Sequence, residues 1–249
     1  MTPDRTELEW TYQPDDLFEA PYRYDDTEYE LLLEEGRAKA TLRAPQDPVN
    51  QELGARIGGH VENLLLTRQL QVHRRYDLNG PRICQHVEGR RNVVIQVSAA
   101  EVVTVVGQVD IIVRDAAGNV VHDTRTERIA DDTRLLDLIA PKMAQSPELR
   151  EMVRSYSQSI ADPSNELVHL YEVRDCLSNY YDGEGKAKAA LNISNSEWSR
   201  VGRLANDEPV DQSRHRGKHL VGRRPASTTE LEEVRGIVKR WITQFAVKI

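Results

Sequence analysis

The hydrophobic pattern of the sequence changes near Ala130, and this change constrains the fold more than any other feature. Before it, apolar residues alternate with polar ones in short runs, which is the spacing of β-strands. After it, apolar residues recur every three or four positions, as in Thr133–Met143, which is the spacing of one helix face. The sequence therefore predicts an α+β fold, in which a mostly antiparallel β-sheet region precedes a C-terminal α-helical bundle. We expect a strand-rich domain at residues 1–129 and a helical domain at 130–249.

The first 27 residues are rich in Pro, Asp and aromatic side chains. This composition is typical of an extended N-terminal arm, and we expect its aromatic rings to dock on a neighbour. Strand character follows in Tyr29–Arg43, where Glu35-Gly36 interrupts it. Several strands joined by hairpins predict an antiparallel, meander-like sheet.

The middle of the strand-rich region is expected to hold one short helix among its strands. Asn50–Ile57 has helical character, and Gly58-Gly59 would stop it. His60–Tyr76 alternates apolar and polar residues, and Asn79-Gly80 is a strong turn signal. Further strands are predicted at Asn92–Val97, Val102–Val113 and Val120–Arg128, the last two joined by a hairpin loop at residues 115–119.

Local capping signals predict where the C-terminal helices begin. Ser146-Pro147 places a good N-cap before a proline suited to the first helical position, and Asp162-Pro163 restarts a helix in the same way. Ser227 or Thr228 is suited to cap a final helix at Thr228–Val247. Pro141 lies inside an apolar helical pattern, where we expect a break or kink.

Composition argues against several classes of protein. No apolar run approaches the ~20 residues of a membrane span, and the first residues lack the pattern of a signal peptide. Cys84 and Cys176 lie far apart without a CxxC or Cys/His cluster, so we expect neither a disulfide nor a zinc site. Phosphate loops, dinucleotide fingerprints and nucleophile elbows are absent from the sequence. We therefore expect a cytoplasmic protein without metal or cofactor.

One candidate nucleic-acid site is a helix-turn-helix. Glu184–Leu191 and Ser194–Asn206 are predicted helices, and Asn192 in the turn between them tolerates a left-handed backbone. Residues near the start of the second helix would face bases in a major groove, namely Asn195, Ser196, Ser199 and Arg200. The alternative is a simple pair of packed helices with Trp198, Val201 and Leu204 as core.

A second candidate is the basic loop before the last helix. From Arg203 to Arg224 there are six basic residues and three acidic ones, with two histidines between them. Guanidinium groups bind phosphate oxygens in a bidentate way, so we expect nucleic acid at Arg216, Lys218, Arg223 and Arg224, as at Arg200. The positive charge is local, because residues 163–249 carry a net charge of only +2 and residues 1–162 carry −9.

Arg214 and His219, with four residues between them, resemble the Arg-x4–6-His motif of the HEPN superfamily. The resemblance extends over about residues 163–249. It implies an all-helical domain of prokaryotic defence or toxin systems, acting on RNA as a metal-independent nuclease when dimerised. Arg214 and His219 would then be the catalytic pair, because His can move the 2′-OH proton and Arg can stabilise charge on phosphate. The chain departs from the family pattern at His215, where the family usually has Asn or Asp. It also departs after His219, because the family's His usually runs straight into a helix and here Leu220–Ser227 intervene.

The sequence leaves three functions open. The first is a nucleic-acid-linked effector acting on RNA as a homodimer, and the second is a non-enzymatic DNA-binding regulator. The third is a scaffold subunit that binds a protein partner through the N-terminal sheet or arm. A further alternative for the basic loop is structural, namely salt bridges to the acidic N-terminal region.

Overall fold

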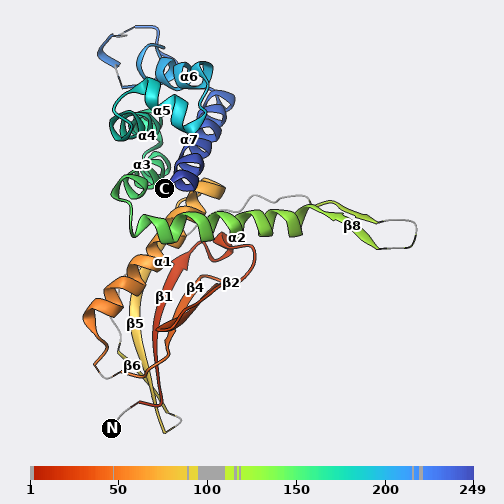
Figure 1. Ribbon diagram of the computed structural model, residues 1–249, viewed down its shortest axis with the longest axis vertical. Coiled ribbons are helices and arrows are strands. Elements are labelled where there is room, and N and C mark those ends of the chain that lie inside the picture. The colour runs from red at the N-terminus through yellow and green to blue at the C-terminus, as the bar shows by residue number, and fades with distance from the viewer. Residues whose placement is uncertain are drawn as a thin grey trace. The chain divides into compact units, whose positions relative to one another are not determined.

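The computed structural model describes residues 3–46, 48–88, 90–94, 110–114, 117, 119–214, 216–218 and 221–249. They belong to two compact units, one within residues 1–68 and 76–136, the other within 69–75 and 137–249. The strands belong to the first unit and most helices to the second (Figure 1), which confirms the predicted α+β fold. The expected domain boundary at residues 129 and 130 falls inside a helix, α2 (Thr124–Met143).

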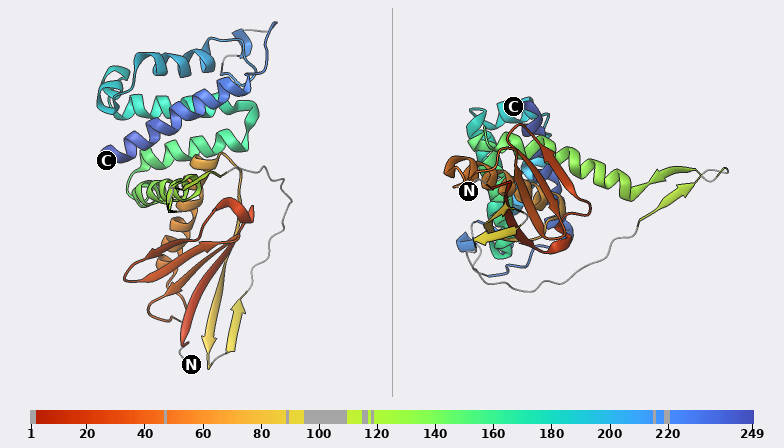
Figure 2. Two further views of the ribbon diagram at one scale, coloured as in Figure 1. Left: turned by 90° about the vertical axis from the view of Figure 1, so that its right-hand side faces the viewer. Right: turned by 90° about the horizontal axis from the view of Figure 1, so that it is seen from below.

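A six-stranded antiparallel sheet, ordered β2-β3-β4-β1-β5-β6, forms the first unit's centre (Figures 1 and 2). Its strands are β1 (Arg5–Gln13), β2 (Tyr22–Asp25), β3 (Tyr29–Glu34), β4 (Arg37–Leu42), β5 (Asp77–Val87) and β6 (Arg90–Val94), with a 3-10 turn, η1, at Asp15–Leu17. The expected N-terminal arm is wrong, because β1 pairs with β4 and β5 inside the sheet. Leu8, Trp10 and Tyr12 on β1 are buried, so these side chains belong to the unit's own core.

Between β4 and β5 the chain forms one long helix, α1 (Gln51–Val72). The short helix expected at Asn50–Ile57 and the strand expected at His60–Tyr76 are therefore wrong. The helix buries Leu53, Ile57, Val61, Leu64 and Leu65, a spacing that fits a helix face better than a strand. Gly58 does not stop the helix, and a Cβ there would lie 3.8 Å from Trp10, so α1 packs closely on β1.

Asn79-Gly80 lies inside β5 and not in a turn. The pairing of β1 with β5 shifts register between Glu9 and Thr11, opposite this dipeptide. Gly80 has a φ of +122°, and a Cβ there would lie 2.9 Å from the carbonyl oxygen of Glu9. Glycine is needed at this β-bulge because a side chain has no room and the backbone conformation excludes it.

A separate two-stranded sheet pairs β7 (Ile112–Arg114) with β8 (Val120–Asp123). The predicted strand at Val120–Arg128 is too long, because Asp123 caps a helix and accepts hydrogen bonds from the amides of Arg125 and Thr126. That helix is α2, and Pro141 does not break it before Met143. The predictions for residues 95–109, 115, 116 and 118 lie outside the described residues.

The second unit consists of packed helices around an apolar core. They are α3 (Pro147–Ala161), α4 (Glu166–Tyr180), α5 (Glu184–Leu191), α6 (Asn195–Asn206) and α7 (Thr228–Lys248), with 3-10 turns η2 (Pro163–Asn165) and η3 (Arg216–Lys218). The predicted caps are confirmed at Ser146 and Ser227. Ser194 caps α6, and both Ser194 and Ser227 form complete capping boxes. Among the described residues, no helix is long and apolar enough to span a membrane.

Candidate functional site

The loop between α6 and α7 has a folded base. Val210 and Arg224 form a parallel bridge, and the amide of Arg224 donates to the carbonyl of Pro209 at 3.0 Å. The amide of Arg214 donates to the carbonyl of Ala205 at the end of α6, at 2.8 Å. Val210 and Ser213 are buried. These contacts fix the backbone position from which the Arg214 side chain projects.

The Arg214 guanidinium lies against α4. Its Cζ is 4.6 Å from the ring centroid of Tyr171, and its Nη1 is 3.3 Å from Oδ2 of Asp175. Tyr171 and Asp175 are one helical turn apart, so they form a platform on one face of α4. The Arg214 side chain is 37% exposed. Among the described residues its Nε and Nη2 have no hydrogen-bond partner, so part of the guanidinium can take an anion.

Behind Arg214, cations and rings form a stacked column that reaches the core. Arg174 lies on Tyr171 and Trp198, with its Cζ 5.1 and 4.9 Å from the two ring centroids. The ring centroids of Trp198 and Trp241 are 5.1 Å apart, and both indoles are buried. A cation over an aromatic face contributes about 0.5–2 kcal/mol. The column therefore holds Tyr171 in place as the surface on which Arg214 rests.

The carboxyl of Asp175 has an unusual environment for a surface acid. Burial raises its pKa above the ordinary value, while Arg214 and Arg174 act in the opposite direction. When charged, Asp175 holds Arg214 by a charge-assisted hydrogen bond. An anion that binds Arg214 would therefore compete with Asp175, whose charged form burial has already made less favourable.

The other predicted phosphate-binding arginines are held by groups of the second unit. Arg216 donates to the carbonyl of Ser164 at 2.7 Å and to the side chain of Asn165. Arg223 pairs with Asp211, and Arg224 donates to both carboxylate oxygens of Glu230 at 2.7 Å. These partners lie in the C-terminal unit, and not in the acidic N-terminal region that the structural alternative invoked. A phosphate would have to displace them.

His215 and His219 lie outside the described residues, and Lys218 is described only by its backbone in η3. The pairing of Arg214 with His219 stays a prediction.

The helix-turn-helix candidate has the predicted backbone. Asn192 has left-handed dihedrals (φ 53°, ψ 45°) between α5 and α6. Trp198, Val201 and Leu204 are buried, as the alternative of two packed helices predicts. The following contacts involve the proposed base-reading residues. Asn195 accepts from Lys188 at 2.7 Å, Ser196 contacts Ser194, and Arg200 donates to Glu233 at 2.9 Å and to Glu208. Ser199 is exposed.

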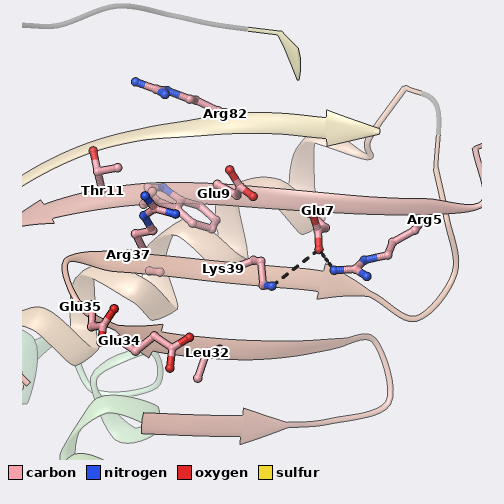
Figure 3. A pocket seen from close by; sticks show the side chains of 12 residues that line it. Arg5, Glu7, Glu9, Thr11, Leu32, Glu34, Glu35, Arg37, Lys39 and Arg82 are labelled. Atoms are coloured by element: carbon pink, nitrogen blue, oxygen red, sulfur yellow. Dashed lines mark hydrogen bonds and ion pairs between the residues drawn. The ribbon is translucent and has the colours of Figure 1, made fainter. Parts of the chain in front are cut away.

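A second surface is a hollow of about 670 Å³ over the sheet of the first unit (Figure 3). Glu7 lies there with its side chain only 4% exposed, hydrogen-bonded to Arg5 and 3.0 Å from Nε2 of His86. Burial alone would raise the pKa of Glu7, but His86, Arg5 and Lys39 outweigh it and lower the pKa. Acidic and basic side chains both line this face, so it is a mixed-charge surface and not a single-sign one.

The described residues contain no group of three or more side chains placed to hold a metal ion. Comparison with protein-family models, with curated proteins and with solved structures finds no match to this chain. Sequence reasoning missed Tyr171 and Asp175 as neighbours of Arg214. Their spacing of four on a predicted helix places them on one face, but nothing in the sequence connects that face to a loop some forty residues later.

Proposed function

We propose that the C-terminal unit binds RNA at Arg214 and acts as a metal-independent ribonuclease of the HEPN kind. The observation that supports this is the position of the Arg214 guanidinium, which lies over Tyr171, donates to Asp175 through Nη1 only, and belongs to a side chain that is 37% exposed. The helical surroundings, and the position of the motif between α6 and α7, agree with the resemblance. Arg200, Arg216, Arg223 and Arg224 are secondary contacts because each already has partners.

In the proposed reaction Arg214 binds the non-bridging oxygens of the scissile phosphate and stabilises the extra charge of the transition state. His219 removes the proton from the 2′-OH as that oxygen bonds to phosphorus. The bond from phosphorus to the 5′-oxygen breaks, and that oxygen takes a proton from an acid. A homodimer supplies a second His219 for this acid role. The products are a cyclic phosphate and a free 5′-OH.

The test is cleavage of single-stranded RNA in the presence of a chelator. Arg214→Ala and His219→Ala should each lower the rate at least about 100-fold without changing the melting temperature. Arg240→Ala is the matched control, because Arg240 is a half-exposed arginine on α7 paired with Glu197. Full activity of the Arg214→Ala/His219→Ala double variant refutes the proposal.

A DNA-binding regulator is the second candidate, supported by the left-handed Asn192 and the capping box at Ser194. Ser199→Glu would place a negative charge on the exposed face of α6. Loss of salt-dependent duplex binding in that variant, with duplex binding intact in Arg214→Ala, would favour the regulator over the ribonuclease.

A further inference from the structure

Exposed apolar side chains are concentrated on the β7–β8 ribbon. Among the described residues, nine large apolar side chains are exposed, and five of them lie here, between 43% and 60% exposed. They are Ile111, Ile112, Val113, Val120 and Val121. Adjacent strand residues point to opposite faces, so both faces of the ribbon are apolar. A two-stranded ribbon is only marginally stable alone in water, and an apolar patch of this kind marks an interaction site.

The base of the ribbon is fastened to its own unit. The amide of Thr124 donates to the carbonyl of Ile111 at 3.1 Å, and the hydroxyl of Thr124 accepts from the amide of Ile111 at 2.9 Å. Arg128 on α2 binds Asp110 at 2.9 Å and also Glu19 near η1. Figures 1 and 2 show the ribbon continuing from the N-terminal end of α2. The apolar strands are thus presented on a fixed base.

We propose that β7 is a dimerisation strand, which pairs antiparallel with β7 of a second copy of this chain about a twofold axis at Ile112. The sequence from Asp110 to Arg114 reads Asp-Ile-Ile-Val-Arg. In this register Ile112 faces its own copy, Ile111 faces Val113, and Asp110 faces Arg114. Every cross-strand pair is then apolar with apolar or acid with base, which is the pairing that stabilises antiparallel strands.

Pairing through β8 gives a poorer match. A twofold antiparallel pair of two β8 strands centred on Val121 places Val120 against His122 and Asn119 against Asp123, so an apolar group faces a polar one and no acid faces a base. The described residues give β7 a single strand partner, β8. Pairing through β7 gives a four-stranded sheet, β8-β7-β7-β8, which exceeds the ~three strands needed for independent stability. The interface is isologous, as is usual for homodimers.

The first test is sedimentation of the full chain over a range of concentrations. The wild type should be a dimer, and Ile112→Lys should raise its dissociation constant at least about 30-fold, because two like charges then meet at the axis. Val247→Lys is the matched control, since Val247 is also exposed but lies on α7. A monomeric wild type, or a dimer that Ile112→Lys leaves unchanged, overturns the proposal. Unchanged circular dichroism confirms that Ile112→Lys still folds.

The second test fixes the register by cross-linking. In Ile112→Cys the two introduced thiols face each other, so mild oxidation should give a covalent dimer. Ile111→Cys alone should cross-link poorly, while a mixture of Ile111→Cys and Val113→Cys should give a heterodimer. Cys84 is buried and Cys176 is partly buried, so the wild type serves as background. Equal cross-linking at all three positions overturns this register. Neither test depends on Arg214 or on RNA.

Discussion

The guanidinium of Arg235 on α7 holds the carboxylate of Glu166, the first residue of α4, through both its Nε and its Nη2, the latter at 2.8 Å. Only 2% of the Glu166 side chain is exposed. Nε2 of His73 lies 3.8 Å from the same carboxylate. A buried ion pair of this kind is costly to break, because removing one partner leaves the other charge uncompensated.

Glu166→Gln is therefore expected to lower the free energy of unfolding by about 3 kcal/mol in urea titrations followed by circular dichroism. Asp182→Asn is the control, since Asp182 is 91% exposed and pairs with Lys186 on the surface. That substitution should cost less than about 0.5 kcal/mol. Equal losses in the two variants would show that burial does not strengthen the Glu166 pair.

His73 should make stability depend on pH. Burial lowers its pKa from 6.5 to about 4, Arg235 adds to this effect and Glu166 opposes it. The unfolded chain then binds more protons between pH 6.5 and 4, so stability falls as pH falls through this range. The loss reaches up to about 3 kcal/mol. His73→Asn should flatten the curve of stability against pH, because Asn does not titrate. Asn is the replacement of choice since it tolerates the positive φ of this position. Parallel curves for the two proteins would contradict this.

Tyr171 should act on Arg214 through its ring and not through its hydroxyl. Tyr171→Phe keeps the face on which Arg214 lies and removes only the acceptor for Nη1 of Arg174. Tyr171→Leu removes the ring. We expect RNA binding to persist in Tyr171→Phe and to fall about 5–10-fold in Tyr171→Leu, measured by fluorescence anisotropy. Comparable losses in both variants would assign the effect to the hydroxyl.

Asn192 should tolerate glycine better than alanine. Its left-handed backbone costs an ordinary residue about 1–2 kcal/mol and costs glycine almost nothing. Asn192→Ala should therefore lower the melting temperature by several degrees, and Asn192→Gly should leave it nearly unchanged. Calorimetry of the two variants side by side decides this, and the reverse order would show that the Asn side chain matters more than its backbone.

The C-terminal helices were predictable because their signals are local. Ser194 with Glu197 and Ser227 with Glu230 are capping boxes readable within four residues. Helix α1 was mispredicted because Leu64, Leu66, Leu70 and Val72 alternate like a strand, and Gly58-Gly59 resembles a stop. The face of the sheet that α1 covers decides its conformation, and that sheet forms from distant residues.

Strand β1 and the surroundings of Arg214 were not predictable for a related reason. A strand that starts a chain has no sequence signal for a central place in a sheet, and β1 lies between β4 and β5. Arg214 was identified by a short motif, but its contacts with Tyr171 and Asp175 depend on how α4 packs beside the loop. Tertiary packing supplies this information, and local sequence does not.

The stacked column beneath Arg214 links the basic loop to a buried tryptophan, so the fluorescence of the second unit should report what binds at Arg214. Tyr171 contacts both Arg214 and Arg174, and Arg174 is the next neighbour of Trp198. An anion that binds Arg214 on Tyr171 offsets the charge of the guanidinium and therefore changes the charge environment of a buried indole. Anion binding at the loop should therefore shift the tryptophan emission without any added label. Trp10 in the other unit contributes a constant background to that signal.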